Sequence, residues 1–155
     1  MRLRAAWLAC LCVGLPLPAA AVITCNLSPT PLAFGSVDTL RGPTASSTAT
    51  IDVTCTTSGA VAAAVSLNLS TLATGAAVRR MGDPAGPRYQ IFADSARTQP
   101  WGDGSGGTVA LSAVGTVLPG VVFRQRFTVY GRVLAPQTDL RAGAYFDTLT
   151  VILNY

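Results

Sequence analysis

Six segments of the chain alternate between apolar and polar residues with a period of two. In one of them the apolar residues Ile51, Val53 and Cys55 are separated by single polar residues. Successive side chains of a β-strand point to opposite faces, so this pattern predicts strands with one buried face. The six runs lie at 50–55, 65–70, 89–93, 109–113, 123–130 and 148–155.

Turn-forming residues separate these runs. Glycine, often with proline, serine or aspartate, clusters at 42–43, 58–59, 82–84, 102–107, 119–120 and 143. No stretch beyond residue 21 has a 3.6-residue period with helix caps. Short strands joined by turns of this kind predict an all-β sandwich of about seven strands, in one domain.

The last alternating run reaches the final residue of the sequence. Its apolar positions are Leu149, Val151, Leu153 and Tyr155. An immunoglobulin-like sandwich has a further strand after this one. We therefore expect a sandwich that lacks its final strand.

The first 21 residues have the features of a secretory signal. Arg2 and Arg4 give a positive start, residues 5–15 are apolar, and alanines at 19–21 suit a signal peptidase. The apolar run is too short for a bilayer, which takes about 20 residues. We expect residues 1–21 to be the signal and residues 22–155 to be the domain, with no membrane insertion after cleavage.

Two cysteines remain beyond the signal, Cys25 and Cys55. A pair of cysteines in an exported domain indicates a disulfide, here closing a loop of about 31 residues. The alternatives are two free thiols or half of a metal site. The chain has no histidine, so a zinc site lacks ligands. The disulfide is favoured.

The charged residues are few and of two types. The formal net charge of +4 falls to about +2 without the two arginines of the signal, too little to indicate nucleic-acid binding. The sequence contains no lysine, glutamate or histidine. A nucleophilic serine therefore has no partner base, and general acid–base catalysis near neutral pH has no ordinary candidate. We expect a protein that is not an enzyme and that needs no cofactor.

The segment 101–107 has the sequence Trp-Gly-Asp-Gly-Ser-Gly-Gly. Aspartate and glycine recur in calcium loops, but this segment has one carboxylate, Asp103. A glycine-rich turn pinned by Trp101 is the favoured interpretation. If the domain binds a surface, Trp101 and Asp103 are the candidate contact residues.

Three arginines, Arg124, Arg126 and Arg132, share one face of a predicted strand with Tyr130. Such a face is able to hold an acidic or carbohydrate partner. A solvated strand face, with arginines that discourage edge aggregation, is the favoured interpretation.

Several short segments together resemble the spore coat protein U family. Cys25 is followed by Leu-Ala-Phe-Gly at 32–35 and by Ile-Asp-Val-Thr-Cys at 51–55. Further similar segments lie at 89–94, 101–104, 130–133 and 143–151, with Arg97 and Gln137 between them. The similarity extends over essentially the whole chain beyond the signal.

This resemblance implies an archaic, Csu-type chaperone–usher pilus subunit, or a spore coat protein. Such subunits have a pilin-type immunoglobulin fold without its final strand, and a partner's strand completes it. The implied partners are a periplasmic chaperone, an usher and other pilus subunits. The implied location is the cell surface or a pilus, reached through the periplasm. The implied acceptor groove is bordered by Leu149, Val151, Leu153 and Tyr155.

One feature departs from the pattern of polymerising subunits. Three residues, Val22 to Thr24, separate the expected cleavage site from Cys25, whereas a donated strand needs about five or six residues. We therefore expect a subunit that accepts a strand and does not donate one. The alternatives are an adhesin-like binding module at a pilus tip and a coat protein outside a pilus, with a secreted enzyme as a minor third.

Overall fold

The computed structural model describes residues 21–40, 42, 44–71, 78–82 and 86–155. The described residues contain no helix. The expected signal segment lies almost entirely in residues 1–20, outside the described residues. The strands are β1 (Ile23–Pro29), β2 (Ser46–Thr57), β3 (Ala63–Thr71), β4 (Arg79–Arg80), β5 (Arg88–Phe92), β6 (Leu111–Val117), β7 (Phe123–Val133) and β8 (Val151–Asn154).

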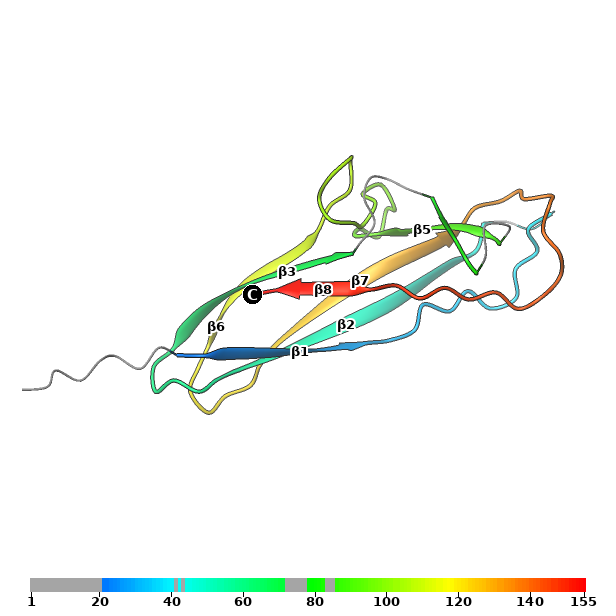
Figure 1. The fold of residues 1–155 in the computed structure, drawn as a ribbon. Helices are drawn as coiled ribbons and strands as arrows, with labels where there is room; N and C mark the ends of the chain where they lie inside the picture. Colours follow the sequence, from blue (N-terminus) through cyan, green and yellow to red (C-terminus); the bar gives the residue numbers. More distant parts are fainter. Residues whose placement is uncertain (1–20, 41, 43, 72–77, 83–85) are drawn as a thin grey trace, which may run out of the picture.

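The strands form two antiparallel sheets packed as an immunoglobulin-like sandwich (Figure 1). One sheet has the order β1-β2-β7-β5-β4 and the other has the order β6-β3-β8. Strands β2 and β7 form the longest ladder, from Ser46 opposite Arg132 to Cys55 opposite Phe123. The predicted all-β sandwich is confirmed.

The core lies between the two sheets and follows the period-two pattern. On β2, the side chains of Ile51, Val53 and Cys55 are buried. Val65, Leu67 and Leu69 of β3 face them from the other sheet as members of the same core cluster. Burying a side chain of this size contributes about 1.5–3 kcal/mol, so these strands hold the sandwich together.

The strands differ from the predicted runs in their bounds, most clearly at β6 and β8. Strand β6 begins at Leu111, because Val109 instead forms a bridge with Trp101. Strand β8 comprises Val151–Asn154, shorter than the predicted run 148–155. Two strands were not predicted. Strand β1 alternates like the others, with Ile23, Cys25 and Leu27 half-buried against the core, and was missed. Strand β4 has two residues, too few to show a period.

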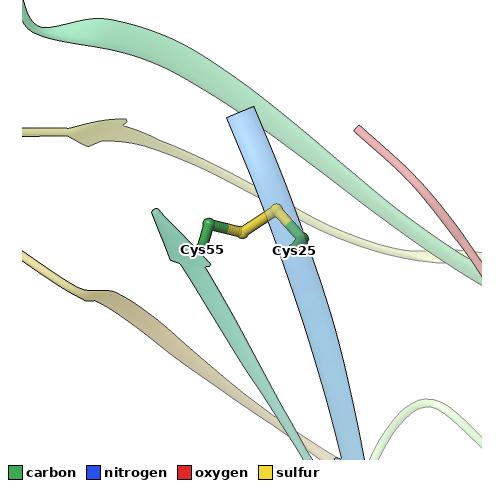
Figure 2. Close-up of a disulfide and its surroundings, with 2 residues drawn as sticks. All are labelled: Cys25 and Cys55. Atoms are coloured by element: carbon green, nitrogen blue, oxygen red, sulfur yellow. A yellow bond between two sulfur atoms is a disulfide. The ribbon is translucent and has the colours of Figure 1, made fainter. Parts of the chain in front are cut away.

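The disulfide between Cys25 and Cys55 joins β1 to β2 (Figure 2). The two cysteines are directly opposite each other in the antiparallel ladder, and their Cα atoms are 4.1 Å apart. The predicted pairing on adjacent strands is confirmed. The separation is slightly below the expected range of about 4.4–6.8 Å. Residues directly opposite each other in an antiparallel ladder have Cα atoms about 4.5–5.5 Å apart, so the observed separation is also below that range.

Candidate functional site

Two strands at the margins of the sheets have one free edge each within the described part of the chain. Strand β1 pairs only with β2, and β8 pairs only with β3. The described residues 31–40, 42 and 44–45 between β1 and β2 are irregular, and so are residues 134–150 between β7 and β8. A free strand edge carries unpaired N–H and C=O groups and is a template for another strand.

A cleft of about 900 Å³ lies between these two irregular segments. Residues 31–40 form one wall and residues 140–147 form the other. Its floor comes from the five-stranded sheet, with the buried side chains of Tyr89, Ile91 and Val133. The cleft therefore opens directly onto the core.

Apolar side chains dominate the cleft. Leu32 and Phe34 line one wall and are half-buried against the core. Phe34 packs edge-to-face on Tyr89, with ring centroids 6.1 Å apart. At the rim, 56% of Leu40 and 80% of Phe146 are exposed. Exposed apolar groups around a concave site are typical of a surface that binds another molecule.

The segment 141–148, which contains most of the second wall, is unusual because all eight of its residues are exposed and none is in a strand. Tyr145 and Phe146 belong to this segment, and the exposed fraction of Tyr145 is 36%. A segment with two aromatic residues ordinarily buries at least one face. Phe146 is the exception, because the described residues leave 80% of it exposed.

A hydrogen bond holds this exposed segment to the floor of the cleft. The Tyr89 hydroxyl donates to Asp147 Oδ2 at 2.6 Å. Burial raises the pKa of Tyr89 above its usual value, and the Asp147 carboxylate raises it further. The phenol stays protonated and remains a donor at any physiological pH.

The opposite wall depends on a glycine of β7. A Cβ atom at Gly131 would lie 2.6 Å from Leu32 Cδ2 and 2.7 Å from Phe34 Cζ. The missing side chain leaves the space that both residues occupy. Gly131 therefore allows the irregular segment to place two apolar side chains on the sheet.

The four residues expected to border the acceptor groove lie beside this cleft and do not line it. Leu149, Val151 and Leu153 are half-buried and pack against the core cluster. Tyr155 follows β8, and its exposed fraction is 56%. The residues that do line the cleft were missed as site residues, although Leu32, Phe34, Tyr145 and Phe146 lie in segments that carried the family resemblance.

The role suggested for Trp101 as a surface contact is wrong. Its side chain is 3% exposed, and the indole N–H donates to the carbonyl of Leu69 at 3.2 Å. The favoured interpretation, a glycine-rich turn pinned by a tryptophan, agrees with this burial. Asp103 remains exposed, and its Oδ1 accepts hydrogen bonds from the backbone and hydroxyl of Ser105. Both bonds hold the pKa of Asp103 below its usual value, and the bond from the Ser105 hydroxyl has the larger effect.

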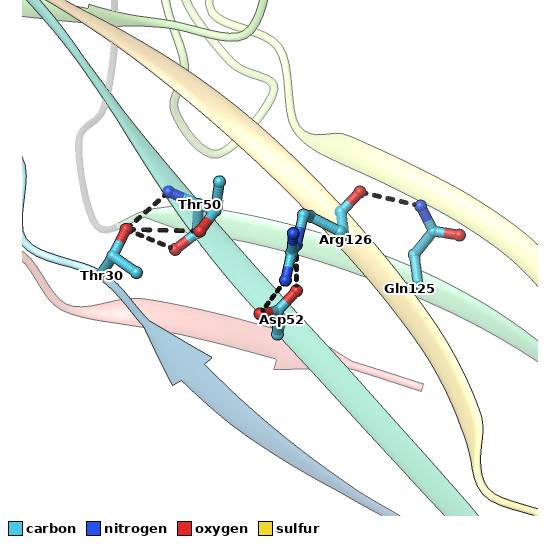
Figure 3. Close-up of polar contacts among 5 residues, drawn as sticks. All are labelled: Thr30, Thr50, Asp52, Gln125 and Arg126. Carbon is cyan, nitrogen blue, oxygen red and sulfur yellow. Dashed lines mark hydrogen bonds and ion pairs between the residues drawn. The ribbon is translucent and has the colours of Figure 1, made fainter.

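The arginine face of β7 is partly neutralised within the domain (Figure 3). Arg126 binds both carboxylate oxygens of Asp52, at 2.6 and 2.9 Å. The hydrogen bond from Arg126 holds the pKa of Asp52 below its usual value. Nearby, the Thr50 N–H donates to Thr30 Oγ1, which continues the β1–β2 pairing beyond Pro29. The exposed ion pair between Arg126 and Asp52 agrees with the favoured interpretation of a solvated strand face.

The described ranges hold no group of three or more histidine, cysteine, aspartate or glutamate residues placed to bind a metal ion. No helix there is long and apolar enough to cross a membrane.

The chain was also compared with known proteins. A family model described as Spore Coat Protein U domain matches residues 9–152, nearly the whole chain. No curated protein matches it.

Proposed function

The chain belongs to the Spore Coat Protein U domain family of pilus and coat proteins, and we propose that it is an exported surface subunit completed by a partner's strand. The observation that carries this proposal is the apolar cleft between residues 31–40 and 140–147, which opens onto the core. The proposed function of the domain is assembly or adhesion rather than catalysis.

The free edges of β1 and β8 support strand addition. A strand laid between them has unpaired backbone groups available on both sides. Alternate side chains of that strand face the core, where Tyr89, Ile91 and Val133 form the floor. The strand also covers the exposed aromatic residues of the segment 141–148. Main-chain hydrogen bonds supply affinity, and the cleft supplies register.

The proposed partners follow from the family resemblance. A periplasmic chaperone fills the groove first, and a neighbouring subunit's extended segment replaces it at the usher. The domain then stands at the cell surface, in a pilus or a coat.

We further propose that this subunit accepts a strand and does not donate one. With cleavage after Ala21, the mature chain begins at Val22. Residues Ile23 and Thr24 are already paired with Thr57 and Thr56 of β2, and the carbonyl of Val22 accepts from the Ser58 N–H. Such a subunit sits at the end of a polymer or works outside one.

A fusion experiment tests strand acceptance. A flexible linker and a strand of alternating valine and threonine are attached after Tyr155. The matched control carries lysine in place of each valine. The valine fusion should raise the melting temperature and suppress aggregation, whereas the lysine fusion should not. If the unfused domain is monomeric and as stable as the valine fusion, strand acceptance is refuted.

Two measurements test the remaining points. The intact mass of the exported protein should correspond to a chain that starts at Val22, and a retained Cys10 would refute the proposed cleavage. Purified protein bound to its chaperone, mixed only with itself, should form no fibres. Linear self-polymerisation through the N-terminus would identify an ordinary polymerising subunit.

A further inference from the structure

Strand β6 is an unprotected edge strand. It lies at one margin of the three-stranded sheet and pairs only with β3 among the described strands. It has seven residues, Leu111–Val117, and none is charged or proline. The uncharged stretch continues on both sides of the strand and comprises residues 104–123, between Asp103 and Arg124. Natural proteins protect such edges with charges, prolines or bulges, because a free edge pairs with other chains.

The other marginal strands differ from β6. Strand β4 consists of two arginines, Arg79 and Arg80. Strand β1 ends in Pro29, and the free edges of β1 and β8 are those already proposed to take a partner's strand. Within the described part of the chain, β6 alone has a free edge with neither a protective residue nor an assigned partner.

The outer face of β6 is self-complementary. Ser112, Val114 and Thr116 point away from the core and are exposed. The exposed fraction of Val114, 82%, is the highest of any large apolar side chain described. An antiparallel pair of β6 strands with its two-fold axis at Val114 places valine opposite valine. In the same register, Ser112 of each copy lies opposite Thr116 of the other, a hydroxyl pair.

The inner face of β6 has the same symmetry. In this register Ala113 lies opposite Gly115, and Leu111 lies opposite Val117. Small residues therefore meet small residues, and aliphatic residues meet aliphatic residues. The ring of Phe123 covers Gly115, because a Cβ atom there would lie 2.3 Å from its Cε2. No residue of the seven meets an unlike partner.

We propose that two copies of this chain associate edge to edge through β6, in antiparallel register about Val114. The pairing joins the three-stranded sheets of the two copies into a single six-stranded sheet, with the two-fold axis at its centre. An isologous contact of this kind closes on itself and gives a dimer. One seven-residue edge buries little surface, so the contact is weak for isolated domains. It strengthens when many copies stand side by side on a surface, through multivalency.

This inference does not rest on strand acceptance, which uses β1, β8 and the cleft. The two surfaces lie on different strands, so the two proposals are tested separately.

Cysteine cross-linking tests the register on the exported full-length gene product. In the proposed dimer the two Val114 Cα atoms lie about 4.5–5.5 Å apart, within reach of a disulfide. Val114→Cys should therefore give a covalent dimer under mild oxidation. Ser112→Cys alone should not, because the two copies of residue 112 are about 13 Å apart. Mixing the Ser112→Cys and Thr116→Cys proteins should restore cross-linking.

A charge variant tests the contact without cysteine. Val114→Lys places two like charges opposite each other and should weaken dimerisation in sedimentation velocity by at least ten-fold. Val61→Lys and Val61→Cys are the controls, because Val61 is 67% exposed in the turn between β2 and β3. Cross-linking of Val61→Cys equal to that of Val114→Cys would overturn the proposal. It would also be overturned by a dimer that Val114→Lys leaves intact, or by no cross-linking at position 114.

Discussion

The hydroxyl of Tyr89 donates a 2.6 Å hydrogen bond to Asp147, which ties β5 of one sheet to the segment that enters β8 of the other. Asp147 lies in the exposed segment 141–148, so this bond fixes one wall of the cleft to its floor. Tyr89 itself is buried.

Tyr89→Phe should lower the free energy of unfolding by about 1 kcal/mol, because the hydrogen bond is lost while the ring still fills its site. Hydrogen exchange at residues 141–150 should increase more than elsewhere. Tyr145→Phe is the matched control, since its hydroxyl donates to the carbonyl of Arg141 within the same exposed segment. Equal effects of the two variants on unfolding and exchange would contradict a specific role for Tyr89.

Gly131→Ala should destabilise the domain by about 1–3 kcal/mol, the usual cost of overpacking a core. The new methyl group would displace Leu32 or Phe34. Gly143→Ala is the control, because a Cβ atom there meets nothing closer than Tyr145 at 3.9 Å. Urea denaturation measures both. An unchanged urea midpoint for Gly131→Ala would show that Leu32 and Phe34 move aside without a loss of stability.

Replacing both cysteines by serine should cost about 3.5 kcal/mol, the chain-entropy value for the loop that the disulfide closes. Periplasmic yield should fall accordingly. Thermal melts of the oxidised protein and of the double variant give the comparison. The oxidised protein treated with reductant should match the variant. A double variant with an unchanged melting temperature would mean that the β1–β2 ladder suffices alone.

Stability should fall in acid because several carboxylates are hydrogen-bonded in the fold. The backbone N–H of Gln99 and then the hydroxyl of Thr98 hold the pKa of Asp94 below its usual value, and Ser105 does the same for Asp103. A folded-state pKa below the unfolded value gives stability that is present above the unfolded pKa and is lost as the pH falls. The melting temperature should be level above about pH 5 and decline below about pH 4.

The matched variants Asp94→Asn and Asp103→Asn should each reduce this decline. The amide keeps one acceptor oxygen but does not titrate. Melting curves from pH 7 down to about pH 2 supply the slopes. A decline of the same steepness in both variants would assign the acid sensitivity to other carboxylates.

The sequence predicted the sandwich well where strands are paired on both sides. The alternation on β2 and β7 gave the correct buried faces, because a central strand must send every second side chain into the core. The last run was less accurate. Its first residues, including Leu149, have an alternating pattern but no paired strand beside them within the described ranges, so the regular strand begins at Val151.

The cleft was harder to predict than the strands. Its walls are irregular segments, and irregular chain has no period to identify which residues face inward. Trp101 was assigned two roles from the sequence, a pin for a glycine-rich turn, which was favoured, and a candidate surface contact. The structure agrees with the favoured role, because the indole is buried and its N–H donates to the carbonyl of Leu69.

The position of the disulfide also has a mechanical consequence. Cys25 is the third residue of β1, and its partner Cys55 lies near the end of β2. A pulling force applied to the chain at Val22 reaches the covalent bridge after three residues and passes into β2. The rest of β1, from Asn26 to Pro29, then carries none of the tension. This strand would not be peeled from its neighbour by such a load, whatever the strength of its hydrogen bonds.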